Sequence, residues 1–138
     1  MKVAKLQVDK IFLTFDEIEL IRKVELPEHL DRIRNTFLFA FYTGLRHSDL
    51  FRLSKSNIVE YKGNTLISFV PQKTDSFYSK SRKKIEIVLI PEAVEIIEKY
   101  KETYYKALPV ISNQKMNEAL KIIGEKAGIN DKVRGIYV

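Results

Sequence analysis

Apolar residues recur at three- and four-residue spacing along much of the chain, which is the spacing of helices that bury one face. The first predicted helix follows Thr14, which forms a capping-box pattern with Glu17 three residues later. This helix ends before Pro27. Its apolar stripe consists of Ile18, Leu20, Ile21 and Val24.

A second helix is predicted over about residues 28–45, and its half from 36 to 42 is almost wholly apolar. We therefore expect this helix to be central and buried on most sides. Gly44 suits the left-handed residue that closes a helix. A short helix follows at about residues 48–53.

Two more helices are predicted near the end of the chain, from Pro91 to about residue 105 and over about residues 113–127. Pro91 fits the first turn of a helix, and Gly128 is a plausible stop for the last one. Four tyrosines on the apolar helices are interpreted as packing residues: Tyr42, Tyr100, Tyr104 and Tyr105.

In the middle of the chain, three segments rich in β-branched residues predict strands: 58–61, 65–70 and 84–90. The first two are separated by Lys62-Gly63-Asn64, which is typical of a hairpin turn. A long loop, residues 71–82, joins the second strand to the third. We predict an α+β fold, a mainly helical domain with a small three-stranded antiparallel sheet.

Composition narrows the class of protein. The chain has 138 residues, of which 45% are hydrophobic and 30% charged, as expected for one folded domain. No apolar run is long enough to span a membrane, and the first ten residues lack a signal core, so we expect a cytoplasmic protein. There is no cysteine, and His29 and His47 follow no ligand spacing, so no metal site is predicted.

Charge is concentrated in one segment. Between residues 62 and 84, six basic residues against the single acid Asp75 account for +5 of the formal net charge of +6. Such a cluster attracts polyanions and supplies phosphate contacts, although a solvated lysine-rich loop without a partner explains it equally well. The basic residues are Lys62, Lys73, Lys80, Arg82, Lys83 and Lys84.

Two cations stand at places where they could do chemistry. Arg46 lies at the junction after Gly44, and its guanidinium could hold two phosphate oxygens while Asp49 keeps it in place. On spacing alone, a local Arg46–Asp49 ion pair that stiffens the corner is the favoured interpretation. Lys73, where the second predicted strand ends, could reach a phosphate or protonate a leaving oxygen. Taken alone, it is more simply a surface lysine.

The segment Thr-Gly-Leu-Arg-His-Ser-Asp-Leu at 43–50 resembles the first arginine box of the tyrosine recombinases, the phage-integrase family, and especially the integrases of bacterial mobile elements. Three other segments match in order. They are 13–18, similar to the start of the family's catalytic domain; 72–74 with 87–91, similar to its strand-borne lysine and the return into a helix; and 112–128, similar to the helix before its second box. The likeness covers about residues 9–130.

The resemblance implies an enzyme that cleaves and rejoins double-stranded DNA through a 3′-phosphotyrosine intermediate, without metal or nucleotide cofactor. It implies that Arg46 clamps the phosphate, that Lys73 protonates the departing 5′-oxygen, and that Asp49 orients Arg46. The residues implied to lie along the DNA backbone are Lys62, Thr74, Lys80, Arg82, Lys83 and Lys84.

The family also needs a second box, His/Lys-x-x-Arg, then a His or Trp, and then the nucleophilic Tyr. No histidine follows His47, and Tyr137 is not preceded by these residues. We therefore expect 1–138 to be a single partial catalytic domain, without the family's DNA-clamping domain and carboxy-terminal catalytic segment. Such a fragment would bind DNA without cleaving it, as a monomer or weak dimer, whereas the parent would form tetramers on DNA.

Two other interpretations remain open. One is a non-catalytic DNA-binding module that keeps the phosphate site and acts by occupying DNA. The other is a helical protein-interaction domain whose charge is incidental.

Overall fold

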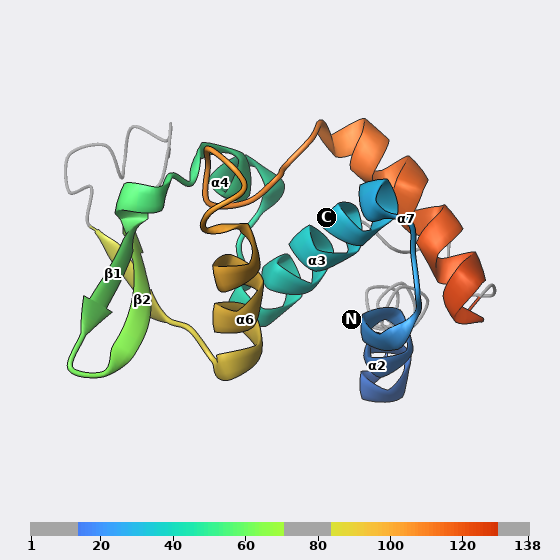
Figure 1. Ribbon diagram of the computed structural model, residues 1–138, viewed down its shortest axis with the longest axis horizontal. Helices are drawn as coiled ribbons and strands as arrows, with labels where there is room; N and C mark the ends of the chain where they lie inside the picture. Colours follow the sequence, from blue (N-terminus) through green and yellow to red (C-terminus); the bar gives the residue numbers. More distant parts are fainter. Residues whose placement is uncertain (1–13, 71–83, 130–138) are drawn as a thin grey trace, which may run out of the picture. The chain divides into compact units, whose positions relative to one another are not determined.

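The computed structural model describes residues 14–70 and 84–129. The chain divides into two compact units, Met1–Phe37 with Ile111–Val138, and Leu38–Val110. Figure 1 shows the elements along the chain. None of the helices in the described ranges has the length and apolar character needed to cross a membrane. The two units are described in turn.

The first unit contains α2 (Phe15–Lys23), the first part of α3 (Glu28–Thr43) and α7 (Asn113–Ala127). The predicted capping box is confirmed. The Thr14 amide donates to Glu17 Oε1 at 2.8 Å, and the Glu17 amide donates to Thr14 Oγ1 at 3.1 Å. Because both donors are satisfied locally, α2 begins where the sequence indicates.

The buried face of α2 is narrower than predicted. Ile18 and Ile21 are buried, but Leu20 is 48% exposed, so its place in the stripe was wrong. Leu20 lies 200° around the helix from Ile18, on the side away from the core. α2 packs against α7, whose residues Met116, Leu120 and Ile123 are buried.

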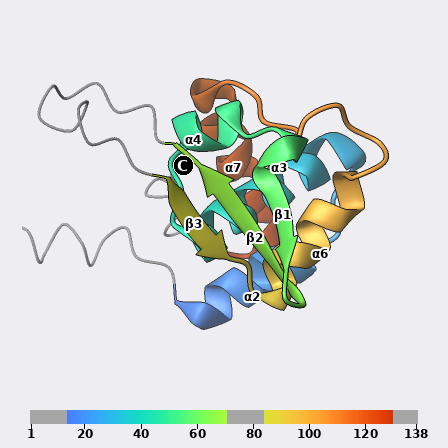
Figure 2. The same cartoon turned by 90° about the vertical axis from the view of Figure 1, so that its left-hand side faces the viewer.

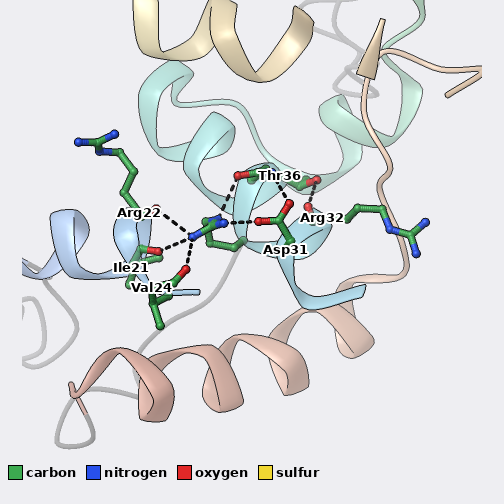
Figure 3. Close-up of polar contacts among 8 residues, drawn as sticks. Ile21, Arg22, Val24, Asp31, Arg32 and Thr36 are labelled. Atoms are coloured by element: carbon green, nitrogen blue, oxygen red, sulfur yellow. Dashed lines mark hydrogen bonds and ion pairs between the residues drawn. The ribbon is translucent and has the colours of Figure 1, made fainter. Parts of the chain in front are cut away.

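A buried arginine joins α2 to α3 within this unit. Arg34 is 8% exposed, and its Nη1 donates to the carbonyls of Ile21, Arg22 and Val24 at 2.9, 2.9 and 3.0 Å (Figure 3). Its guanidinium also forms an ion pair with Asp31. The last carbonyls of a helix lack partners within the helix and carry its negative dipole end, so the cation satisfies both needs of α2.

α3 ends at Thr43, two residues earlier than predicted, and Gly44 follows with φ +76 in the left-handed region. The Gly44 amide donates to the Ala40 carbonyl at 2.8 Å, which closes the helix. Thr36 and Phe39 are fully buried, whereas Phe41 is 44% exposed. The apolar half of α3 is therefore central, but one side of it meets solvent.

The second unit continues with α4 (His47–Arg52), the short 3-10 helix η1 (Lys55–Asn57), three strands and α6 (Pro91–Tyr100). The strands are β1 (Ile58–Tyr61), β2 (Asn64–Phe69) and β3 (Ile85–Val88), antiparallel in the order β1-β2-β3. The predicted α+β fold is confirmed. In Figures 1 and 2 the sheet lies to one side of α4 and α6, and Figure 2 faces it.

The hairpin between β1 and β2 turns on two residues, Lys62 and Gly63, with φ +52 and +82. Two consecutive positive φ values are the mark of a type I′ turn, whose twist matches that of the strands. The turn sets the register in which Ile58 lies opposite Ile67, and Ile87 of β3 lies on the other side of Ile67.

α6 ends at Tyr100, about five residues before its predicted end. Tyr100 is the last buried residue of its inner face, and the next buried segment, 107–110, is not helical. The chain must leave the helix axis to bury that segment. Tyr105 is 78% exposed, so its interpretation as a packing residue was wrong, whereas Tyr100 is confirmed.

Candidate nucleic-acid interface

The arginine corner is built by α3's last turn and α4's first. Thr43 Oγ1 donates to the Phe39 carbonyl at 2.8 Å and accepts from the Leu45 amide at 3.3 Å, so one hydroxyl holds both sides of Gly44. Arg46 then takes an extended conformation, with φ −83 and ψ 163, and is the N-cap of α4. The sequence thus places Arg46 on a fixed corner rather than within a helix.

The Arg46 side chain is exposed, and no residue within 14–70 or 84–129 forms a hydrogen bond or ion pair with it. Asp49, its predicted partner, instead lies 3.8 Å from Nη1 of Arg52. The reason is local geometry: Asp49 and Arg52 are three residues apart within α4, whereas Arg46 precedes the helix with non-helical ψ. The local Arg46–Asp49 ion pair is therefore not formed.

Arg52 also joins α4 to the end of β2. Its Nη2 donates to the carbonyl of Val70 at 3.2 Å, one residue beyond the strand. A second bond, from Asn57 Nδ2 to the Ser68 carbonyl at 3.0 Å, ties η1 to the same strand. The end of β2 is thus held against the segment that begins at Arg46.

A pocket of about 220 Å³ lies where these segments meet. Its lining contains one carboxylate, one guanidinium and one side-chain amide among apolar groups. The lining residues are Asp49, Arg52, Leu53, Asn57, Phe69 and Val70. The two segments that the sequence singled out, the arginine box and the strand leading to Gln72-Lys73-Thr74, therefore border one pocket.

Of the six basic residues in the segment 62–84, the structure describes two, Lys62 and Lys84. Lys62 is at the hairpin turn and Lys84 directly precedes β3, next to the Phe69–Ile85 pair. They lie at opposite ends of β2, whose six residues span about 20 Å. Five other predicted site residues lie outside the described residues: Lys73, Thr74, Lys80, Arg82 and Lys83.

Three cations that sequence reasoning missed make contacts around α4. Besides Arg52, these are Lys106, whose Nζ donates to the Phe51 carbonyl at 2.9 Å, and Lys55, whose Nζ donates to the Lys101 carbonyl at 2.7 Å. The Asp49–Arg52 spacing was a signal for the first. No sequence signal foretold the lysines, because each bond joins residues about fifty positions apart.

Among the residues that the structure describes, neither histidine takes part in a candidate metal site. His29 is exposed, and His47 stacks on Phe51 with ring centroids 6.0 Å apart. Within 14–70 and 84–129, no three His, Asp or Glu side chains gather closely enough to hold a metal ion.

Comparison with known proteins adds one finding. The structure is similar to the XerH site-specific recombinase, solved bound to its difH substrate in a pre-cleavage complex, with a TM-score of 0.60 and 15% sequence identity. The match covers 91% of this chain but only 40% of the XerH chain. No family model and no curated protein matches the sequence. The chain therefore has the fold of part of a tyrosine recombinase.

Proposed function

We propose that this chain is part of a tyrosine-type site-specific DNA recombinase, similar to those of mobile elements, and that its second unit binds a backbone phosphate of double-stranded DNA through Arg46. The observation that carries the proposal is the arginine corner. An exposed guanidinium without a partner among the described residues stands at the start of α4, the helix whose Asp49 and Arg52 line the pocket where β2 ends. The likeness to XerH, which was solved with its DNA substrate, supports the proposal.

Lys73 is the proposed second cation of this site. It lies three residues along the chain from Val70, and three residues of extended chain span about 10 Å. The bonds that fix Val70 near α4 thus tether the segment that carries Lys73. Lys73 is proposed to contact, from this segment, the same phosphate as Arg46.

The proposed reaction needs Arg46 and Lys73 of this chain together with a tyrosine of the complete enzyme. In the complete enzyme, a tyrosine hydroxyl loses its proton to water, and its oxygen attacks the scissile phosphorus and forms a phosphotyrosyl bond as the bond to the 5′-oxygen breaks. Lys73 gives its proton to that 5′-oxygen. Arg46, which stays charged, stabilises the negative charge that develops on the phosphate oxygens. No metal or nucleotide is required.

The 138 residues alone are proposed to bind DNA without cleaving it, because Arg46 and Lys73 are present without a recognisable second box. A nicked suicide duplex tests this directly, since it traps any covalent adduct. A tyrosine-linked adduct with this polypeptide would refute the proposal. We further propose that the chain is a monomer or weak dimer, and a stable tetramer in sedimentation without DNA would contradict this.

Replacement of Arg46 tests the phosphate site. Arg46→Ala should weaken duplex binding, measured by fluorescence anisotropy, by about tenfold or more, because a charge-assisted hydrogen bond is lost. The plot of log affinity against log salt should lose about one unit of slope. Arg32→Ala, which removes an exposed arginine from α3, is the matched control. Equal losses in both variants would show that Arg46 contributes only bulk charge.

A non-catalytic DNA-binding module is the second candidate, in which the exposed Arg46 holds a phosphate without cleavage. The same substitution separates the two in a full-length parent. In an enzyme, Arg46→Ala abolishes cleavage while much of the binding survives. In a binding module there is no cleavage to lose.

A further inference from the structure

Two lysines bind the helix ends of the second unit reciprocally. Lys106, in the chain that follows α6, donates to the carbonyl of Phe51 in the last turn of α4 at 2.9 Å. Lys55, in η1 just after α4, donates to the carbonyl of Lys101, the C-cap of α6, at 2.7 Å. Each helix therefore has its negative end bound by a cation from the segment that follows the other. Figure 1 shows the chain after α6 passing beside α4.

α4 depends on such contacts. It has six residues, far fewer than an isolated helix needs to be stable in water. On the inner side of α4 Leu50 is buried, and Leu53, the first residue after the helix, is buried as well. On its outer side the Lys106 ammonium binds the Phe51 carbonyl and lies 4.4 Å from the centre of the Phe51 ring. Lys106 thus contacts both the backbone carbonyl and the aromatic ring of Phe51.

Arg46 stands at the other end of this short helix. Its carbonyl accepts the Leu50 amide at 3.0 Å, so its backbone belongs to the first turn of α4. No described residue holds its side chain. The placement of α4 therefore sets the position of the Arg46 backbone, from which the side chain extends. Lys106 holds α4 at its other end.

We infer that Lys106 is a positioning residue for Arg46: it fixes α4 through the Phe51 carbonyl and so presents Arg46 to a DNA phosphate. This inference rests on the proposed function of Arg46. It differs from a direct DNA contact by Lys106, and from a general contribution of Lys106 to stability. These three roles give different results in the following experiment.

The experiment measures affinity for a double-stranded oligonucleotide in two backgrounds, the natural chain and Arg46→Ala. Lys106→Met keeps the length of the side chain and removes its charge and its donors. It should lose most of the affinity that Arg46→Ala loses, and in the Arg46→Ala background it should change affinity by less than about twofold, since the two act through one contact. Lys106→Arg, which keeps a cationic donor, should restore binding.

Lys55→Met is the matched control, because it removes the same charge and the same kind of bond but frees the end of α6 instead of α4. Lys55→Met should weaken binding by at most about twofold to threefold, the loss expected for one distant charge. Losses of Lys106→Met and Arg46→Ala that multiply would show a direct contact and overturn the inference. A Lys55→Met loss equal to that of Lys106→Met would overturn it as well.

Hydrogen exchange without DNA keeps the inference separate from the function on which it rests. Lys106→Met should speed exchange of the Leu50 amide, and Lys55→Met should leave it unchanged. Unchanged Leu50 exchange in Lys106→Met would overturn the inference even if DNA binds. Faster exchange in a chain that does not bind DNA, or in which Arg46→Ala has no effect, would refute the proposed function while leaving Lys106 as the residue that holds α4.

Discussion

Single arginines fix both units of the molecule, and they do so in different ways. Arg34 is buried and donates hydrogen bonds to three main-chain carbonyls, whereas Arg52 is partly exposed, donates to one carbonyl and forms an ion pair with one carboxylate. A guanidinium can do this because its donors point in several directions at once, which the single nitrogen of lysine cannot match.

Removal of the buried guanidinium should be severe. Arg34→Met removes the guanidinium that pairs with Asp31 and binds the last carbonyls of α2, in a site closed to most water. We expect a loss of roughly 3–5 kcal/mol in the free energy of unfolding. Urea denaturation measures it. Arg32→Met, on the exposed side of the same helix, should stay within about 0.5 kcal/mol, and equal midpoints for the two variants would contradict this account.

The partly exposed arginine has a close counterpart for comparison. Arg52 and Arg22 each pair with an acid three residues earlier and are 38% and 40% exposed, and Arg52 also donates to the Val70 carbonyl just beyond β2. Arg22 forms a hydrogen bond to Glu19 that lowers the pKa of that carboxyl. Arg52→Lys should therefore cost about 0.5–1 kcal/mol, and Arg22→Lys less than about 0.3 kcal/mol, in thermal unfolding. A larger loss for Arg22→Lys would refute the role of the Val70 bond.

At the scale of elements, the corner between α3 and α4 depends on one backbone conformation. A Cβ added to Gly44 would meet no atom within 4 Å, so substitution there tests the left-handed φ of +76 alone. Gly44→Ala should cost about 1–2 kcal/mol, and Gly44→Asn much less, because asparagine tolerates this region. Unfolding by urea measures both. Equal costs would show that a side chain at this position is harmful for another reason.

Elements with local signals were predictable from the sequence. The capping box at Thr14, the glycine stop at Gly128 and the turn at Gly63 depend on neighbours within four residues, and each was confirmed. The end of α6 was not predictable, because it is set by the need to bury 107–110, a tertiary effect. The hydrogen bonds of Lys55 and Lys106 were not predictable for the same reason, since each joins residues distant in sequence.

The candidate site follows the same division. Arg46 could be singled out because a glycine and a helix start flank it within three residues. In this structure Asp49 pairs with Arg52 rather than with Arg46, and spacing alone does not reveal this because Arg46 leaves the helical path at ψ 163. Contacts to the end of β2 depend on the fold, so the bond from Arg52 to the Val70 carbonyl became recognisable only with the structure.

At the scale of the whole molecule, most of the net charge lies in the segment 62–84. If this segment follows a DNA backbone, replacing Lys80, Arg82, Lys83 and Lys84 with Ala should reduce the slope of log affinity against log salt by about two to four units. Filter binding at several salt concentrations measures the slope. The matched control removes four exposed lysines elsewhere: Lys101, Lys115, Lys121 and Lys126. Equal slopes in the two variants would show that the segment is only solvated charge.

The hairpin turn has a consequence for how the chain can evolve. Lys62 occupies a left-handed position where asparagine before glycine is the favoured pair. Lys62→Asn should therefore raise the free energy of unfolding by about 0.5–1 kcal/mol and, if this lysine meets a phosphate, weaken duplex binding. Calorimetry and anisotropy on the same variant would then move in opposite directions, which is the signature of a residue kept for its charge at the expense of a tighter turn. If Lys62→Asn raised both the free energy of unfolding and the affinity for duplex DNA, Lys62 would have no role in DNA binding.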